Sequence, residues 1–504
     1  MTTDFYRSIK PALNELADYE LFDTLSQIRY YVMDANVNGF ESFKKEIGFE
    51  LNTLISFDWI DFLIVNTIIF SQDYKSINQK RLKDFANRQK LFDKIFPVYQ
   101  KVFQLNGQDR NWLVYRGFRE RLLNKRSCQN VFSLIQKCNT TFGNERIRTH
   151  IENVIQMPYK DFLNLGLYLY TYFSIQDACC FSYPKSWFLN IPEGFREKYV
   201  TNSNLNRIFN ILSCNIIDYK SLLKNEVKYD NENIFNIHSI SYNKYPLIEK
   251  DSTLYCPIPD KLIMQISEGI YHIADLPSLN KSENNLSTLI GVGFETYIGD
   301  LIRLINVRKR FEVEKEIVFG KPERKTSDWI VLDDDSIIFI ECKTKRLQIE
   351  SRSQLEVTEN LKKDLNDIAK GIAQLYSVID FYERNLIDGL QFNAIRDIYP
   401  VMVTFQEYGF SSARFKEVIN QMVKEYFLSR GINSDSVDKR PFYIYSASEF
   451  EVDFQIMEKL GIKEYFKLLS ADLINSDYRE LFNPKKIFFE EYVKEFGPGS
   501  YLHS

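Results

Sequence analysis

Two acidic residues and a lysine stand where two apolar runs begin and end. Asp328 opens the run 328–332, and the run 336–343 closes on Glu341 and Lys343. In a β-strand alternate side chains share a face, so Glu341 and Lys343 are expected to point the same way. The short acidic turn Asp333–Asp335 predicts an antiparallel hairpin, which brings the start of the first strand beside the end of the second. Asp328 is therefore expected close to both residues.

Two carboxylates beside an ammonium group indicate a particular chemistry. Packed carboxylates raise each other's pKa unless a cation neutralises them, and a hard divalent ion such as Mg²⁺ suits oxygen ligands. The lysine can orient or deprotonate an attacking water, or stabilise negative charge on a phosphate. The alternative is a solvated hairpin in which Glu341 and Lys343 form a surface ion pair that contributes little.

Asp328 followed by Glu341-Cys342-Lys343 resembles the D…(D/E)-x-K signature of the PD-(D/E)XK nuclease superfamily, with Ser327 in place of the proline. The resemblance implies a restriction-endonuclease-like fold and a Mg²⁺ site in which Mn²⁺ can substitute. Its implied metal ligands are Asp328, Glu341 and the backbone carbonyl of Cys342. Lys343 is implied to act on the attacking water.

The flanking segments extend the resemblance over 285–406. Residues 293–302 resemble the first core helix, on which the family places an acid that completes the metal site directly or through water. Glu295 is that acid, and Asp300 falls away from the same arc. A helix expected over 355–382 carries Gln374, which some members place near the site. Strands are expected over 310–319 and 399–405, so the order is helix, three strands, helix, strand.

Length and patterning predict the domain organisation. The chain of 504 residues is 44% hydrophobic, enough for several buried cores. We expect an all-α helical domain over 1–228, a connector over 229–284, the nuclease-like core over 285–410 and a C-terminal α/β extension over 411–504. The predicted fold class is an α/β restriction-endonuclease-like core, a mixed sheet flanked by helices, with a large all-α N-terminal domain.

The implied substrate is nucleic acid, DNA in preference to RNA. The formal net charge of −4 excludes a uniformly basic nucleic-acid binder, so binding must use local basic patches. The segment 75–126, where basic and aromatic residues mix, is either such a patch or, as helical spacing alone would produce, a set of core aromatics beside a solvated basic face. Another candidate patch is the basic residues of the expected core: Arg303, Arg308, Lys309, Arg310, Lys321, Arg324, Lys325, Lys345 and Arg346.

The biological setting is inferred from what the sequence lacks. Seven scattered cysteines without a C-x-x-C pair, no signal-peptide pattern and no membrane-spanning run predict a cytoplasmic protein. A nuclease core embedded in helices without a phosphate-binding loop resembles bacterial effectors of defence against phage and mobile DNA. Two alternatives remain open: a non-catalytic nucleic-acid- or partner-binding module that retains a nuclease fold, and a nuclease subunit that acts only with a protein partner. Because many endonucleases of this fold dimerise, the resemblance also allows a homo-oligomer.

Overall fold

The computed structural model describes residues 65, 68–69, 131–174, 182–189, 201–226, 241, 244–282, 285–346, 359–406, 413–429, 434–471, 473–474, 478–479, 482 and 484–489. The described residues fall into two compact units. The first comprises residues 149–277 together with 65 and 68–69, and the second comprises 131–148 and 278–489. Helices α8 (Glu145–Ile155) and α16 (Leu276–Ser282) cross the divisions. The basic segment 75–126 and the tail 490–504 lie outside the described residues.

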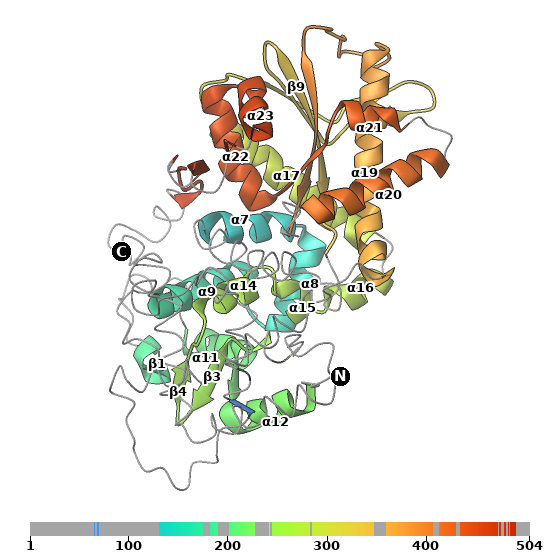
Figure 1. Ribbon diagram of the computed structural model, residues 1–504. Helices are drawn as coiled ribbons and strands as arrows, with labels where there is room; N and C mark the ends of the chain where they lie inside the picture. The colour runs from blue at the N-terminus through green and yellow to red at the C-terminus, as the bar shows by residue number, and fades with distance from the viewer. Residues whose placement is uncertain are drawn as a thin grey trace, which may run out of the picture. The chain divides into compact units, whose positions relative to one another are not determined.

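The first unit combines helices with a small sheet. Its remaining elements are α9 (Tyr159–Ser174), β1 (Ser182–Pro184), a 3₁₀ turn (Lys185–Leu189), α11 (Asn202–Leu212), β2 (Ser213–Asn215), α12 (Ile216–Glu226), β3 (Leu247–Lys250), β4 (Thr253–Tyr255), α14 (Pro259–Ile266) and α15 (Ile270–Ile273). The strands lie in the order β1-β4-β3-β2 (Figure 1). Asp251 and Ser252 have φ of 49° and 59°, the left-handed conformation of a two-residue hairpin turn between β3 and β4.

The expectation of an all-α domain over 1–228 is therefore wrong for the described part of that stretch. Strands β1 and β2 both fall inside it, and they pair with β4 and β3 from the expected connector. Each has three residues, too few to show the alternating pattern that identifies a strand in a sequence. They are strands because of their partners, which lie 30 or more residues away in the chain.

The second unit is a mixed sheet covered by helices on both faces. Its elements are α7 (Val131–Thr141), α17 (Leu286–Ile305), β5 (Glu312–Lys315), β6 (Val318–Phe319), β7 (Arg324–Lys325), β8 (Trp329–Leu332), β9 (Ser336–Lys343), α19 (Glu359–Glu383), β10 (Asp397–Thr404), α20 (Ala413–Ser429), α21 (Asp435–Lys439), β11 (Tyr443–Ser446), α22 (Ala447–Leu460) and α23 (Ile462–Ser470). Strand order is β11-β10-β9-β8-β5. Strand β8 is antiparallel to β5 and β9, whereas β9, β10 and β11 are parallel.

Several expectations for this unit are confirmed. The turn Asp333–Asp335 joins β8 and β9 as an antiparallel hairpin, and β10 contains all but the last residue of the strand expected over 399–405. Helix α19 corresponds to the helix expected over 355–382 from residue 359 onward. Two differences are instructive: the strand expected over 310–319 is divided between β5 and β6, and β11 of the expected C-terminal extension joins the same sheet.

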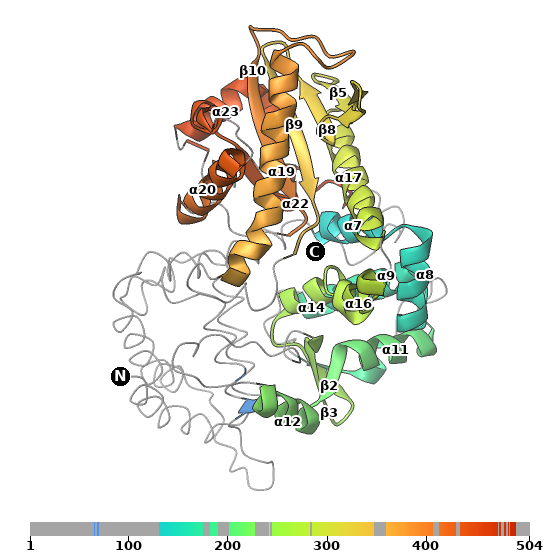
Figure 2. The ribbon, with the colours of Figure 1, turned by 90° about the vertical axis from the view of Figure 1, so that its right-hand side faces the viewer.

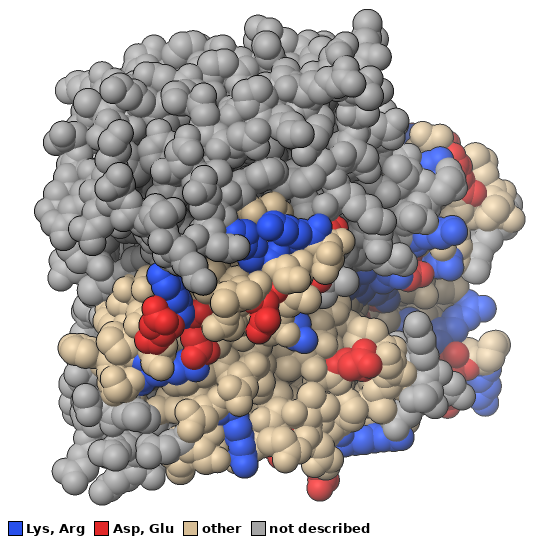
Figure 3. Space-filling view, turned by 90° about the horizontal axis from the view of Figure 1, so that it is seen from below, with Lys and Arg blue, Asp and Glu red and all other residues tan. Residues whose placement is uncertain are grey.

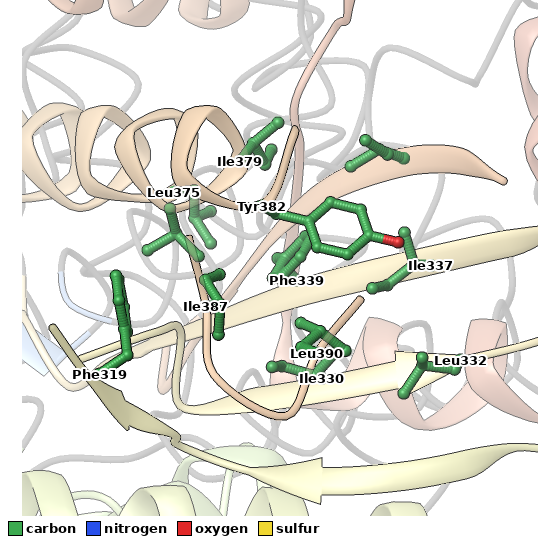
Figure 4. Close-up of a cluster of buried hydrophobic side chains, with 12 residues drawn as sticks. Phe319, Ile330, Leu332, Ile337, Phe339, Leu375, Ile379, Tyr382, Ile387 and Leu390 are labelled. Carbon is green, nitrogen blue, oxygen red and sulfur yellow. The ribbon is translucent and has the colours of Figure 1, made fainter. Parts of the chain in front are cut away.

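The core on one face of the sheet lies under α19, which packs along β9 and β10 (Figure 2). Ile337 and Phe339 of β9 point into a buried apolar cluster with Leu375, Ile379 and Tyr382 of α19 (Figure 4). Since side chains alternate along β9, Glu341 and Lys343 lie on this same face, beyond the end of the cluster. The continuous apolar run of β9 thus makes it a central strand, buried on both faces.

The opposite face is covered by α17, which packs against β9 and α22. Its contact with β8 depends on Gly299. A Cβ at Gly299 would overlap the buried indole of Trp329, and the Trp329 Nε1–H donates to the backbone carbonyl of Glu295 at 2.9 Å. Trp329 directly follows Asp328. This contact therefore fixes the helix that carries Glu295 against the strand that carries Asp328.

Charge is mixed on the surface. On the face that Figure 3 shows, Lys and Arg of the described residues are interspersed with Asp, Glu and uncharged residues. This agrees with the near-neutral net charge of −4. Among the described residues, none of the helices combines the length and the apolar character that a membrane crossing requires.

We predict that Gly299→Ala destabilises the protein by about 2 kcal/mol, because the added methyl group must displace a buried indole. Urea unfolding followed by circular dichroism measures the change. Gly291→Ala, also in α17, is the matched control: its Cβ would meet only Glu295 Oε1 at an ordinary 3.8 Å, so it should be neutral or stabilising by up to about 1 kcal/mol. Equal effects of the two substitutions would contradict this account.

Candidate active site

The register of three strands places three carboxylates in one row. Trp329 pairs with Ile340 and with Lys315, so the next positions oppose Asp328 to Glu341 and to Glu316. Two hydrogen bonds support this alignment: the Cys342 N–H donates to Asp328 Oδ2 at 2.7 Å, and the Glu316 N–H donates to the Asp328 carbonyl at 3.0 Å. Directly opposed residues of antiparallel strands share a face, so Glu316, Asp328 and Glu341 form a row across the sheet in which the charges of the carboxyl groups act on one another.

Lys343 pairs with Glu341 within this row. Its Nζ lies 2.6 Å from Glu341 Oε1, and the two side chains are only 28% and 12% exposed respectively. Burial lowers the pKa of Lys343, but the negative charges of Glu341 and Asp328 outweigh burial and raise it above its ordinary value. Lys343 is therefore an ammonium group at neutral pH in this arrangement.

The carboxyl groups show the electrostatic cost of being packed together. Burial, reinforced by the charge of Glu341, raises the pKa of Asp328 to about 7. Burial and the charges of Asp328 and Glu316 raise the pKa of Glu295 to about 7 as well. Burial also raises the pKa of Glu341, although Lys343 opposes that rise. The site holds more negative charge than its lysines neutralise.

The structure brings Glu295 to the row from α17. Its charge interacts with those of Asp328, Glu316, Lys315 and Lys343. Asp300, the other acid of this helix, pairs instead with Arg303 at 3.1 Å on an exposed surface. Glu295, and not Asp300, is therefore the acid of α17 whose charge reaches the row, and its part in a metal site stays a prediction.

Gln374 and Cys342 differ in their relation to the row. Gln374 is exposed on α19, one turn beyond Gly371, which lies against Lys343. Its participation stays a prediction. Cys342 is buried between the two site residues of β9, with its side chain directed to the opposite face of the sheet. Burial raises the pKa of its thiol, so only its backbone is suited to a role at the site.

Glu316 is the site residue that the sequence analysis missed. It follows β5 and pairs with Lys325 of β7 at 2.9 Å, the two side chains being 27% and 67% exposed. Its negative charge raises the pKa of Glu295, Asp328 and Glu341. The alternation of Glu312, Glu314 and Glu316 was a visible signal, but only the register between β5 and β8 shows which of the three reaches the site.

The basic residues expected around the site are dispersed. Lys325 lies at the row of carboxylates, and Lys345 pairs with Asp367 of α19 at 3.0 Å. Arg308 pairs with Glu458 instead, and Arg310 pairs with Asp333, in the turn at the other end of β9. A substrate phosphate at the carboxylate row would therefore meet the lysines rather than the whole basic group.

The donor set fits a hard divalent cation in type and charge, but its present spacing does not hold one. Within the part of the chain that the structure describes, no three His, Cys, Asp or Glu side chains are spaced to bind a metal ion. Two contacts explain this spacing: Lys343 occupies Glu341 Oε1, and Asp328 Oδ2 accepts from the Cys342 N–H. A cation at the row would require the Lys343 ammonium to shift and the carboxylates to converge.

Comparison of the chain with protein-family models, with curated proteins and with solved structures found no match.

We predict that Asp328→Asn stabilises the cation-free protein at pH 8 by about 1 to 2 kcal/mol and has little effect at pH 4. The folded-state pKa of about 7 lies above the ordinary 3.8, so the folded state binds more protons than the unfolded state between these values. The unfolding free energy therefore falls as pH rises through this window. The asparagine removes that cost, and its amide oxygen can still accept from the Cys342 N–H.

Urea unfolding with a chelator present, at pH 4, 6 and 8, measures this effect. Asp300→Asn, at an exposed carboxylate paired with Arg303, is the control and should change stability by less than about 0.5 kcal/mol throughout. If Asp328→Asn destabilises the protein equally at all three pH values, the carboxylates do not repel one another as described.

Proposed function

We propose that this chain is a Mg²⁺-dependent nuclease that hydrolyses phosphodiester bonds, with DNA as the substrate. The observation that carries the proposal is the position of Asp328 directly across from Glu341, with the Lys343 ammonium 2.6 Å from Glu341. The order of the elements supports the proposal, because it is the order that the resemblance implies: α17, then β5, β8 and β9, then α19 and β10. The hairpin β6–β7 is an insertion into that order.

The proposal gives each residue a role that follows from its chemistry. Asp328, Glu341 and the backbone carbonyl of Cys342 would hold the cation, and Glu295 would join them directly or through a water molecule. A divalent ion bound there supplies positive charge that neutralises the surplus of carboxylates and the developing charge of the phosphate. Mn²⁺ offers the same charge and preference for oxygen ligands, so it should substitute.

Lys343 would position the attacking water or a non-bridging phosphate oxygen. As an ammonium it offers three donors and no acceptor, and its pairing with Glu341 places those donors at the row of carboxylates. Its raised pKa depends on the charges of Glu341 and Asp328. When those charges are neutralised, the cause of the rise is removed and the Lys343 ammonium loses its proton more readily.

Cleavage is the first test. Purified protein should cut at least one of linear, circular or single-stranded DNA when Mg²⁺ or Mn²⁺ is present. Asp328→Asn and Lys343→Ala should each lower the rate at least about 100-fold, because each removes a group required in the transition state. Asp300→Asn should cut at the wild-type rate. A wild-type protein that cuts neither DNA nor RNA, or variants that cut equally well, would contradict the proposal.

Cation binding can be measured without catalysis. At pH 8, Mg²⁺ or Mn²⁺ at about 100 times its dissociation constant should raise the unfolding free energy by about 2.7 kcal/mol. At pH 5 the effect should be smaller, since protons compete for carboxyl groups whose pKa is raised to about 7. Asp328→Asn should abolish the stabilisation. A stabilisation that survives this substitution would place the cation elsewhere.

A further inference from the structure

Gly371 lies in the interior of α19, where glycine is an unfavourable residue. In a helix interior glycine is less favourable than alanine, because it loses more backbone freedom on folding. Gly371 is buried, and it is followed along α19 by the residues of the apolar cluster. A glycine at such a position needs a packing reason, and the structure supplies one at the candidate active site.

A side chain at residue 371 would collide with Lys343. An added Cβ would lie 2.7 Å from Lys343 Cε and 2.7 Å from Met402 Cε, closer than carbon atoms approach one another. Met402 opposes Glu341 in the register between β9 and β10. The aliphatic part of Lys343 is therefore enclosed by the backbone of α19 on one side and by Met402 on another, while its Nζ meets the Glu341 carboxylate at 2.6 Å.

This enclosure matters because lysine is a flexible side chain. Its four-carbon chain has several rotatable bonds, and holding it in one conformation costs conformational entropy. The ion pair with Glu341 fixes the end of the chain, and the space left by the missing side chain of Gly371 fixes the path by which Lys343 reaches it. The position of the Lys343 ammonium thus depends on both the ion pair with Glu341 and the space beside Gly371.

We propose that Gly371 is a positioning residue: it leaves the space in which the Lys343 side chain lies and thereby places the Lys343 ammonium against Glu341. The placement of Lys343 by Gly371 is inferred from the geometry alone. Only the effect of Gly371 on cleavage rests on the proposed nuclease function. Close packing of α19 on the sheet is the competing explanation. It predicts that Gly371→Ala lowers stability, whereas positioning predicts that it moves Lys343.

The two explanations differ in what an added Cβ at residue 371 would displace. The two atoms nearest to it are the far ends of flexible side chains, and neither belongs to the backbone. Gly371→Ala can therefore be accommodated by rotation of Lys343 and Met402, while the alanine favours the helix. The expected variant is folded and about as stable as the wild type, with the Lys343 ammonium displaced from Glu341.

Reductive methylation of lysines, followed by peptide mass spectrometry, tests the displacement. In Gly371→Ala the methylation rate of Lys343 should rise at least about threefold, because the ammonium loses its carboxylate partner and its burial. Lys463, which pairs with Asp397 beyond the other end of β9, is the internal control and should not change. Gly291→Ala is the matched glycine substitution, and its Lys343 should react as in the wild type.

Two results would overturn the proposal. One is a folded Gly371→Ala protein in which Lys343 reacts at the wild-type rate, because the lysine then keeps its place without the glycine. The other is a Gly371→Ala protein that does not fold, because the proposal requires the two side-chain ends to yield.

A kinetic measurement connects positioning to catalysis. With a substrate that the wild type cuts, and at a saturating cation concentration, Gly371→Ala should lower kcat about tenfold to a hundredfold and leave KM within about twofold. If the wild type cuts no nucleic acid, the proposed function fails while the methylation experiment still decides the role of Gly371. If kcat is unchanged although Lys343 has become reactive, Gly371 does not position a catalytic lysine.

Discussion

The candidate active site depends on one constraint. The backbone holds several buried carboxyl groups close enough for their negative charges to repel one another. Glu316 and Asp328 lie one position beyond the last paired residues of β5 and β8, and backbone hydrogen bonds from Glu316 and Cys342 to Asp328 keep them next to the end of β9 that carries Glu341. Lys325 and Lys343 each neutralise one outer member of the row. Burial, reinforced by the neighbouring carboxylates, raises the pKa of Asp328 and of Glu295 to about 7. A divalent cation is the simplest species that removes the surplus of negative charge.

The fold supplies the energy that keeps such a site in place. Strand β9 is buried on both faces, by α19 and its apolar cluster on one and by α17 on the other. Trp329 links α17 to β8 through the space above Gly299, and Gly371 lets α19 approach Lys343. Burying apolar surface contributes roughly 25 cal/mol per Å², so these contacts can offset the repulsion of a few carboxylates. The apolar packing of α17 and α19 on the sheet therefore holds the row of carboxylates in place.

The sequence predicts those elements and residues whose position is determined by a local pattern. It does not predict those whose position depends on pairing with a distant segment. Asp328 could be placed beside Glu341 because a three-residue acidic turn leaves one simple hairpin. Glu316 could not be found, since its register with β8 depends on the inserted hairpin β6–β7. The three-residue strands β1 and β2 have too little pattern to be recognised within a helical stretch. The reason for a glycine at residue 371 is visible only when α19 is packed on the sheet, because the neighbouring sequence does not indicate that Gly371 lies next to Lys343.

The central claim is that Asp328 and Glu341 together hold a divalent cation, and crystals of the protein grown or soaked with Mn²⁺ test it most directly. An anomalous difference map should show one strong peak in contact with both carboxylates, with the Lys343 ammonium moved away from Glu341 Oε1. A map without a peak at the row, or with Lys343 still 2.6 Å from Glu341 and the manganese bound elsewhere, would contradict the account.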